Sequence, residues 1–510
     1  MATANTANTA ITAKTNFDTS KDADVVVIGG GPGGYPCAIR AAQLGARVVV
    51  VENDNPGGTC LNWGCIPTKT MIGSVDALNT IRHAKDFGLT ADNIGVDFPA
   101  LMARKDKIVK TLVGGVGYLF KKNGIRSVEG IGSLVDAGTV EIKKADGTTE
   151  RITTSAIVIA TGSVPSKLPI PGIADADIYT SNWEVKRKLK EGTLATGAIW
   201  TSNEAVSAKT IPGEMVILGG GVIGAEFSYT YNGLGTKCTI LEMQDRIIPT
   251  MDTDLSEALG KILSKQGITI KTGVRVTKVE DQDGRKAVTY TNGKAGGEES
   301  VVLADVVLVS TGRVAFTEGL NLEAVGVELG AQKGLRHAIR TDSRMRTNVP
   351  GIYAIGDVTG SGLAHTATAE GLVAAENICG HDQTMSYKAV PACIYTEPEV
   401  ASVGLTEQEA RDKGYEVKVG KFDFRALGKA MAINQRDGFV KVVAEDKYGE
   451  ILGLHIIGPH ATDLIMEGVV SIQLENTVEE LMRTIHAHPT LAEAIGQANE
   501  DVRGLAIDKG

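Results

Sequence analysis

The sequence is poor in cysteine and in long apolar or basic runs, and each of these absences excludes a class of protein. Only 6 cysteines occur in 510 residues, which are too few for the disulfide scaffold of a small secreted protein. No apolar run approaches the roughly 18 residues of a membrane-spanning helix, so no membrane association is expected. The longest basic run is KRKLK at 186–190, and the formal net charge is -9. We therefore expect no nucleic-acid partner, because such partners require a positive surface.

The start of the chain lacks the features of a targeting signal. Residues 1–20, MATANTANTAITAKTNFDTS, have no basic start, no apolar centre and no arginine. This composition disfavours a secretory signal and an organelle transit peptide, and it predicts a disordered tail over 1–22. A cytoplasmic location is therefore expected, with an organelle matrix as the less favoured alternative.

Glycine, in contrast, is abundant, and its spacing predicts a dinucleotide-binding segment. In DVVVIGGGPGGYPCAIRAAQLGARVVVVE (24–52), an apolar strand leads into a glycine-rich turn, a helical pattern and a second strand. Gly29 is expected to make the tight turn, Gly31 to let the backbone approach a pyrophosphate, and Gly34 to let helix and strand pack closely. Glu52 ends the second strand and is expected to bind a ribose hydroxyl.

The same pattern returns at EMVILGGGVIGAEFSYTYNGLGTKCTILE (214–242). Gly219, Gly221 and Gly224 correspond to the three glycines of the first segment, and Glu242 ends the following strand. An acidic side chain at this place accepts a hydroxyl and repels a 2′-phosphate, so the second site is expected to prefer NAD to NADP. Two dinucleotide sites in one chain imply electron transfer between the two bound groups.

Two of the cysteines, Cys60 and Cys65, lie in the glycine-rich segment GGTCLNWGCIPTK (57–69). A zinc site would need a second pair, and the other cysteines are scattered along the chain. A structural disulfide here would close too few residues to stabilise the fold much. A bridge across this spacing needs an irregular turn, which Gly64 and Pro67 make feasible, and such a tight bridge tends to be reducible. A redox-active pair is therefore the favoured interpretation.

With these motifs, residues 24 to 510 resemble the pyridine nucleotide–disulfide oxidoreductases and, among them, the dihydrolipoamide dehydrogenases. GGTCLNWGCIPTK is similar to their redox-cysteine signature, with Trp63 where a smaller residue is usual and Thr68 in place of serine. The resemblance implies an α/β fold with two Rossmann-like domains, for FAD and NAD, and an α+β C-terminal dimerisation domain. Further matching segments are ATGS at 160–163, TGR at 311–313, YAIGDV at 353–358, LAH at 363–365 and HAHPTLAE at 486–493.

The resemblance also implies a division of the chain and a set of cofactor contacts. We expect an FAD-binding domain at 23–165, an NAD-binding domain at 166–300, a central domain at 301–380 that returns to FAD, and an interface domain at 381–510. The segment 180–206, where TSNWEV and TSNEAV nearly repeat, is interpreted as a surface insertion. The implied flavin contacts are Lys69, Gly132, Thr161, Gly162, Ser163, Asp357, Leu363, Ala364 and His365. The further residues implied around the NAD site are Glu226, as the partner of Lys69, with Val276 and Gly312.

Oxidation of a dithiol is helped by a base, because the thiolate is the attacking form. Among the 8 histidines, His488 is followed by a proline and then by Glu493, a carboxylate that could orient its ring. The resemblance implies that His488 is the base, Glu493 its partner and His486 a supporting neighbour. It also implies that this histidine acts on the cysteines of the other subunit of a homodimer.

The activity implied by the resemblance is oxidation of dihydrolipoamide through Cys60 and Cys65, with FAD and NAD+ as cofactors. The implied partners are a second copy of the chain and lipoyl-bearing proteins of the 2-oxo acid dehydrogenase or glycine cleavage complexes. A glutathione reductase, a mercuric reductase and a non-catalytic flavoprotein remain as alternatives. Glu242 argues against the first, which prefers NADP, and the position of the last cysteine, Cys393, argues against the second. No metal site is expected.

Overall fold

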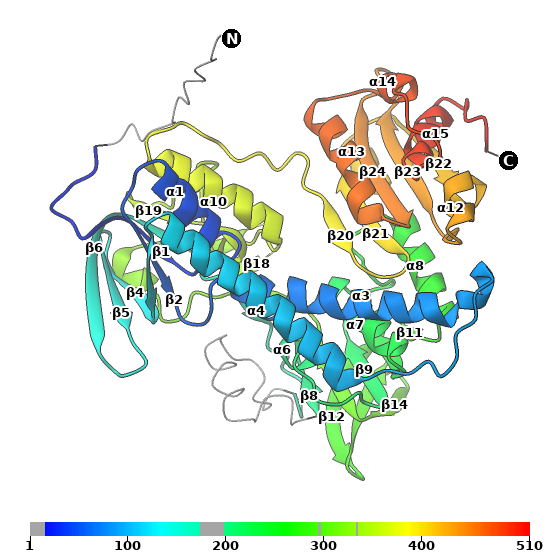
Figure 1. Cartoon of the computed structure of the whole chain (residues 1–510), viewed down its shortest axis with the longest axis horizontal. Helices are drawn as coiled ribbons and strands as arrows, with labels where there is room; N and C mark the ends of the chain where they lie inside the picture. Colours follow the sequence, from blue (N-terminus) through cyan, green and yellow to red (C-terminus); the bar gives the residue numbers. More distant parts are fainter. Residues whose placement is uncertain (1–15, 174–197, 294–296, 333–334, 510) are drawn as a thin grey trace, which may run out of the picture.

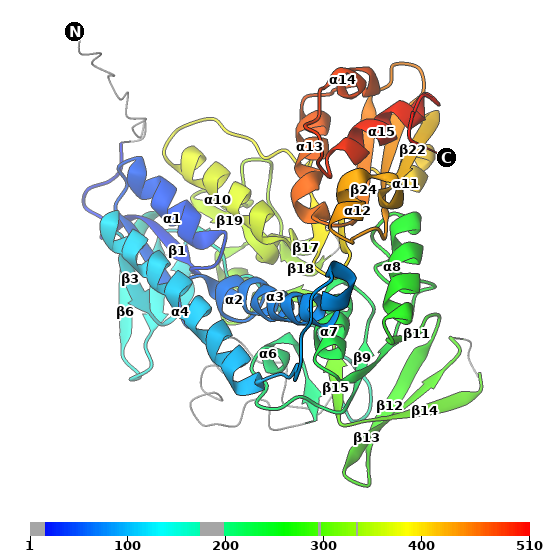
Figure 2. The ribbon, with the colours of Figure 1, turned by 45° about the vertical axis from the view of Figure 1, so that its right-hand side comes forward.

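The chain folds into an N-terminal, a middle and a C-terminal unit, shown from two directions in Figures 1 and 2. The computed structural model describes residues 16–173, 198–293, 297–332 and 335–509. Within these ranges, no helix is both long and apolar enough to cross a membrane.

The N-terminal unit is built on a seven-stranded sheet with a parallel core. Its strands are β1 (Ala23–Ile28), β2 (Val48–Glu52), β3 (Arg126–Glu129), β4 (Ile131–Asp136), β5 (Thr139–Lys143), β6 (Thr149–Ile159) and β19 (Ile352–Ala354). The order is β3-β2-β1-β6-β5-β4, and β19 also pairs with the inner half of β6. Every residue of β1 is buried, as expected for a central parallel strand covered on both faces. The parallel part, β3-β2-β1-β6-β19, is the Rossmann arrangement predicted from the first glycine motif.

Helices from distant parts of the chain belong to this unit. They are α1 (Gly34–Gln43), α2 (Gly58–Asn62), α3 (Cys65–Arg82), α4 (Phe98–Lys122) and α10 (Ala364–Ile378), with the 3-10 turns η1 (Ala84–Phe87) and η2 (Gly356–Thr359). Of these, α3 packs on α4 and on α7 (Val222–Gly233) of the middle unit. In both views α1 and α10 lie side by side over the sheet. The segment after residue 350 therefore returns to the N-terminal unit.

The middle unit repeats the same arrangement. Its elements are β8 (Ile199–Trp200), β9 (Glu214–Leu218), β10 (Lys237–Leu241), β11 (Thr269–Lys271), β12 (Arg275–Gln282), β13 (Arg285–Thr291), β14 (Glu299–Ala304), β15 (Val306–Val309), α6 (Ser202–Ala205), α7 (Val222–Gly233) and α8 (Thr253–Lys265). The parallel order is β11-β10-β9-β15-β8, and β12-β13-β14 form a separate antiparallel sheet. Two Rossmann-like sheets are thus present.

The C-terminal unit is an α+β domain around a five-stranded antiparallel sheet of order β20-β21-β24-β23-β22. Its elements are β20 (Ala392–Ile394), β21 (Glu399–Gly404), β22 (Val417–Asp423), β23 (Phe439–Glu445), β24 (Ile451–Gly458), α11 (Glu407–Asp412), η3 (Phe424–Ala426), α12 (Gly428–Ala432), α13 (Ala461–Gln473), α14 (Val478–Arg483) and α15 (Glu493–Val502). The short elements β7 (Ser163–Pro165), β16 (Arg313–Ala315), α9 (Leu322–Val325), β17 (Leu329–Gln332) and β18 (Leu335–Ile339) complete the described structure.

Three sequence-based boundaries need correction. The boundary expected at residue 300 falls inside β14, and β15 still belongs to the second sheet, so the strands of the middle unit extend to Val309. Of the tail predicted over 1–22, residues 1–15 lie outside the described residues. The rest is held on the first sheet: Asp22 accepts a hydrogen bond from the Thr153 amide at 2.9 Å.

The insertion expected at 180–206 is also corrected in part. Residues 180–197, with the KRKLK run, lie outside the described residues. The following residues are not a surface excursion, because β8 pairs with β15 and the side chain of Thr201 caps α6 in a capping box with Glu204. Thr201 is 0% and Glu204 4% exposed. This part of the segment is therefore core of the middle unit.

A cluster of charges around the buried pair Lys441 and Asp252 joins the middle unit to the C-terminal unit. Lys441 of β23 is 2% exposed, and its Nζ lies 2.9 Å from Asp252, 2.9 Å from Glu407 and 3.2 Å from Asp254. Asp252 also accepts hydrogen bonds from the amides of Asp254 and Glu407, at the starts of α8 and α11. One carboxylate therefore caps two helices of different units, so the cluster fixes how the units meet.

We expect Lys441→Met to destabilise the protein by about 3–5 kcal/mol, because it leaves the buried carboxylate of Asp252 without its cation. Denaturant unfolding followed by circular dichroism measures this change. Lys421→Met is the matched control, because the Lys421 side chain is 38% exposed and its Nζ lies 3.5 Å from Asp254. Equal effects of the two substitutions would contradict the role given to Lys441.

Candidate active site

The first glycine loop has the backbone geometry that a dinucleotide needs. Gly29 has φ of 104°, and a Cβ there would lie 2.3 Å from the carbonyl oxygen of Ala160. A Cβ on Gly34 would lie 1.8 Å from the oxygen of Gly29. Glu52, at the end of β2, accepts a hydrogen bond from the amide of Gly30 at 2.7 Å. Burial raises the pKa of Glu52, and this amide opposes the rise.

The second loop repeats the glycine conformations and the carboxylate hydrogen bond of the first loop. Gly219 has φ of 99°, and a Cβ there would lie 2.7 Å from the oxygen of Ser310. A Cβ on Gly224 would lie 2.0 Å from the oxygen of Gly219. Glu242 accepts from the amide of Gly220 at 2.6 Å. In both loops an acid after the second strand is held beside the glycine turn, where it can accept further hydrogen bonds from a ribose.

The loops also leave room for a ligand beside the second glycine of each motif. A Cβ on Gly221 would meet nothing within 4 Å, and a Cβ on Gly31 would meet only the Cα of Gly58, at 3.9 Å. Near the first loop, the buried hydroxyls of Ser361 and Thr366 have no hydrogen-bond partner in the described structure. Buried hydroxyls are normally paired, so these atoms, at the start of α10, fit a site that a polar cofactor completes.

The two cysteines meet where a helix is interrupted. Cys60 lies in α2, and Cys65 begins α3. Between them, Gly64 has φ of -133° and ψ of -107°, which breaks the helical path. The two thiols are hydrogen-bonded to each other and both are free. The irregular turn predicted from the sequence is therefore present.

The surroundings make the two thiols unequal. The hydrogen bond from Cys60 lowers the pKa of Cys65 to about 7; burial opposes this, and the charge of Lys69 adds to it. The same hydrogen bond, together with burial, raises the pKa of Cys60. At neutral pH, Cys65 is thus the partly ionised member of the pair and Cys60 the protonated one.

We expect alkylation of Cys65 in the reduced protein to be about ten-fold faster at about pH 8 than at about pH 6, because only the thiolate reacts. Iodoacetamide labelling followed by peptide mass spectrometry measures the profile. Lys69→Met should move the profile to higher pH. A wild-type profile centred near the value of a free cysteine, about 8.5, would contradict the assignment.

Lys69 brings all three units together beside the cysteines. Its Nζ lies 2.7 Å and 2.9 Å from the two carboxylate oxygens of Glu226 in α7, as the resemblance implied. Glu226 is 4% exposed and also accepts from the amide of Tyr395 at 3.0 Å. The Tyr395 ring lies 4.5 Å below the Lys69 ammonium group. The redox helix α3 is therefore fixed against both the middle and the C-terminal units.

Arg313 is a site residue that the sequence analysis missed. Its Nε donates to Ser163 Oγ at 2.7 Å, and Ser163 Oγ donates to Asp357 at 2.6 Å. Burial lowers the pKa of Arg313, while the charges of Asp357 and Cys65 raise it. Only Gly312 had been assigned in the TGR segment. The sequence signal that could have identified it is the arginine that ends the TGR segment. In the structure, the glycine before it has φ of 116°.

The remaining predicted residues lie at the ends of strands or helices around the two loops. Thr161 Oγ1 donates to the oxygen of Phe316 at 2.6 Å, and Gly162 has φ of 74°. His365 Nε2 lies 2.9 Å from the oxygen of Pro391. Leu363 and Ala364 begin α10. The others are Gly132, buried in β4, and Val276 of β12, which packs in the core of the middle unit.

His488 and Glu493, predicted as the base and its partner, lie next to each other in the C-terminal unit. His488 Nδ1 and Glu493 Oε1 are 2.8 Å apart, and Glu493 also accepts from the Thr490 amide at 2.8 Å. His486 Nε2 lies 2.9 Å from Glu467. The His488 side chain is 79% exposed. His488 lies in the loop between α14 and α15.

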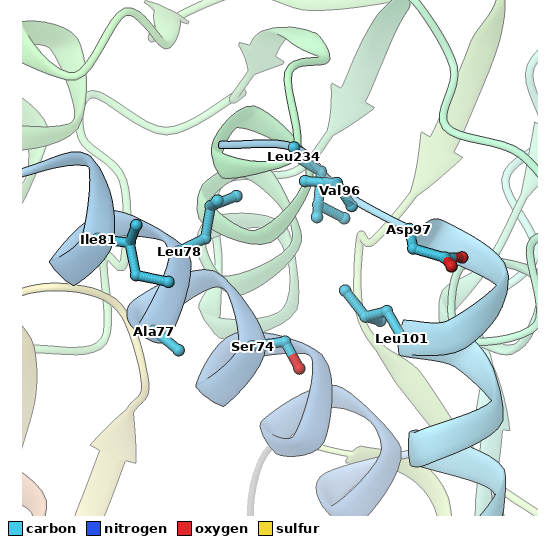
Figure 3. A pocket seen from close by; sticks show the side chains of 9 residues that line it. Ser74, Ala77, Leu78, Ile81, Val96, Asp97, Leu101 and Leu234 are labelled. Atoms are coloured by element: carbon cyan, nitrogen blue, oxygen red, sulfur yellow. The ribbon is translucent and has the colours of Figure 1, made fainter. Parts of the chain in front are cut away.

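A pocket of about 220 Å³ lies between α3, the start of α4 and the end of α7 (Figure 3). Its polar side chains are Ser74 and Asp97, and Asp97 is already used to cap α4 through the amide of Ala100. The apolar lining side chains are Ala77, Leu78, Ile81, Val96, Leu101 and Leu234. None of the predicted site residues lines this pocket, so it is separate from the redox pair. The described residues contain no cluster suited to a metal ion.

Known proteins share this organisation. Residues 23–371 match the family Pyridine nucleotide-disulphide oxidoreductase, and residues 390–499 match its dimerisation domain. The chain is 39% identical to a dihydrolipoyl dehydrogenase of Geobacillus stearothermophilus, with 96% of this chain and 98% of that protein covered. It is 40% identical to a leghemoglobin reductase of Glycine max, with 94% and 87% covered.

A solved structure agrees with these sequence relatives. The crystal structure of LpdA from Mycobacterium tuberculosis superposes with a TM-score of 0.81 at 27% identity, over 94% of this chain and 99% of that one. The repeated dinucleotide loops, the cysteine turn and the matches over nearly the whole length lead to one assignment. The chain belongs to the pyridine nucleotide-disulphide oxidoreductases.

Proposed function

We propose that the protein is an NAD-dependent dihydrolipoyl dehydrogenase, which oxidises dihydrolipoamide to lipoamide through Cys60 and Cys65. The observation that carries the proposal is the thiol pair beside Lys69 and Glu226, in a chain about 40% identical over nearly its whole length to dihydrolipoyl dehydrogenases. FAD is the cofactor of the first loop and NAD+ of the second. When bound, FAD supplies transfer of the electron pair from the cysteines to NAD+.

The residues of this chain have separate tasks in the proposed reaction. His488, held by Glu493 through Nδ1, presents Nε2 to take a proton from the substrate dithiol. In the oxidised form, Cys60 and Cys65 are joined as a disulfide, and the substrate thiolate attacks Cys60, which breaks that bond, forms a mixed disulfide with Cys60 and releases Cys65 as a thiolate. The second substrate thiol then displaces Cys60 from the mixed disulfide and its proton passes to Cys60, so that lipoamide leaves, Cys60 is a thiol and Cys65 remains a thiolate. Lys69 stabilises that thiolate by its charge. Arg313, through Ser163, holds the Asp357 carboxylate that is proposed to bind the ribityl chain of FAD.

The site requires two copies of the chain in this proposal. The C-terminal unit matches a dimerisation domain, and the His488 side chain is exposed on that unit. We infer that His488 of one copy serves Cys60 of the other. Lipoyl-bearing proteins of a 2-oxo acid dehydrogenase or glycine cleavage complex are the proposed substrates. The cytoplasmic location stays a prediction.

We expect Glu242→Gln to raise the KM for NAD+ about ten-fold, because a carboxylate is lost that accepts a ribose hydroxyl. Steady-state kinetics with varied NAD+ measure the change. Glu52→Gln is the matched variant in the other loop and should instead weaken retention of FAD, read from flavin absorbance. Equal use of NADP and NAD by the unmodified protein would contradict the role of Glu242.

The proposed function is tested by mixing the purified protein with dihydrolipoamide and NAD+ and following NADH formation. Glutathione disulfide with NADPH is run in parallel as the alternative pair. NADH formation with dihydrolipoamide and no turnover of glutathione disulfide is the expected result. Turnover of glutathione disulfide alone would keep the family assignment and overturn the substrate.

A further inference from the structure

Trp63 stands between the two cysteines, and its side chain is bonded to a different loop. The indole is 6% exposed, and its Nε1 donates to Asp54 Oδ2 at 2.7 Å. Asp54 is itself 5% exposed. A buried carboxylate is costly unless it is hydrogen-bonded, so this bond satisfies Asp54 and at the same time fixes the orientation of Trp63.

Asp54 is held in place by the first dinucleotide loop. Its amide donates to Glu52 Oε1 at 2.9 Å, and Glu52 is tied in turn to the amide of Gly30. The Asn55 side chain donates to the other carboxylate oxygen of Asp54 at 3.0 Å. The acceptor for the Trp63 indole is therefore a fixed point beside β2.

Trp63 occupies the interruption that brings the cysteines together. Its amide makes the last bond of α2, to the oxygen of Thr59 at 2.8 Å, and Gly64 then leaves the helical path. A Cβ on Gly64 would lie 3.1 Å from the same Thr59 oxygen, so a larger side chain is disfavoured there. Asn62, the residue before Trp63, also donates from its side chain to the oxygens of Gly58 at 2.9 Å and Asn55 at 3.4 Å. The indole bond to Asp54 is the contact of this turn that ends on a buried carboxylate.

We propose that Trp63 is a positioning residue. Its hydrogen bond to Asp54 holds the sulfur atoms of Cys60 and Cys65 at the separation and orientation that disulfide exchange needs. The inference rests on the redox role proposed above for this pair. Two thiols that are held close together in a fixed orientation have a high effective concentration toward each other, which favours formation of their disulfide. Loss of the bond lets the turn sample more conformations and therefore favours the dithiol.

The test is the equilibrium of the purified, FAD-loaded protein with glutathione, without NAD and without oxygen. Cys60 and Cys65 thiols react with one glutathione disulfide to give the Cys60–Cys65 disulfide and two glutathione thiols. Two electrons pass from the protein sulfurs to the glutathione sulfurs, and the two thiol protons go with them. Alkylation and peptide mass spectrometry measure the fractions of protein in the dithiol and in the disulfide form, and these fractions give the exchange constant.

Trp63→Phe keeps the aromatic packing and removes the donor. We expect it to lower the exchange constant about 3- to 10-fold, the range for the net contribution of one ordinary hydrogen bond; ten-fold equals about 30 mV for this two-electron couple. Asp54→Ala should have the same effect without altering the turn itself. The double variant should be no worse than either single one, because both remove one interaction.

Trp200→Phe is the matched control, because Trp200 is a buried tryptophan (4% exposed) in the core of the middle unit. It should leave the exchange constant unchanged, and flavin absorbance checks that each variant is folded. An unchanged constant in Trp63→Phe, or additive effects of the two single variants, would overturn the role of Trp63. If the unmodified protein forms no Cys60–Cys65 disulfide, the redox pair itself fails and the inference fails with it.

Discussion

Replacement of Cys60 or Cys65 by serine abolishes turnover of dihydrolipoamide, with an expected loss of about 10³-fold or more in kcat. A serine hydroxyl neither ionises near neutral pH nor forms a disulfide, so thiol exchange has no second partner. FAD should stay bound, since the cysteine side chains are not needed to hold the glycine loop. Steady-state kinetics together with the flavin absorbance of each variant separate these two expectations.

Cys238 provides the matched control for these variants. It is 0% exposed in the core of the middle unit, and burial raises its pKa to about 12. Such a thiol is unreactive at neutral pH, so Cys238→Ala should keep turnover within about two-fold of the unmodified protein. Full activity of Cys65→Ser would instead favour a non-catalytic role for the pair.

His488→Gln should lower kcat/KM for dihydrolipoamide by about 10³-fold, within the range for loss of a general base. Glutamine keeps a polar side chain of similar reach but takes up no proton. Glu493→Gln should cost less, about ten-fold, because the ring remains and only its orientation weakens. His460→Gln is the control, since the His460 side chain is 62% exposed and lies at the start of α13.

The pH dependence distinguishes a base from a residue that only packs. The pH profile of kcat/KM should differ in shape between the unmodified protein and His488→Gln, because glutamine takes up no proton. A profile of unchanged shape in His488→Gln would contradict its role as the base.

The parts of the site that rest on local backbone geometry could be predicted from the sequence. The tight turn at Gly29 and the close helix contact at Gly34 follow from spacing alone, because only glycine fits there. The same reasoning located the turn at Gly64. In each case the residues that give the prediction and the backbone feature that they predict are neighbours in the sequence.

Contacts between distant segments could not be predicted in the same way. Arg313 meets Ser163 across 150 positions, and Lys441 meets Asp252 across 189. A single sequence does not show that the two members of such a pair meet, because the spacing rules that identify motifs apply only between neighbouring residues. The burial of Thr201 was missed for the same reason: β8 becomes a core strand only when β15 pairs with it.

The central claim, that one copy supplies the cysteines and another the base, is tested most directly by complementation. Cys65→Ser and His488→Gln chains with different tags are co-expressed, and the mixed dimer is purified through both tags. The mixed dimer has one intact site if the base comes from the other copy, so about half of the unmodified activity should return. No activity above that of the two inactive parents would contradict a shared site and place His488 with the cysteines of its own chain.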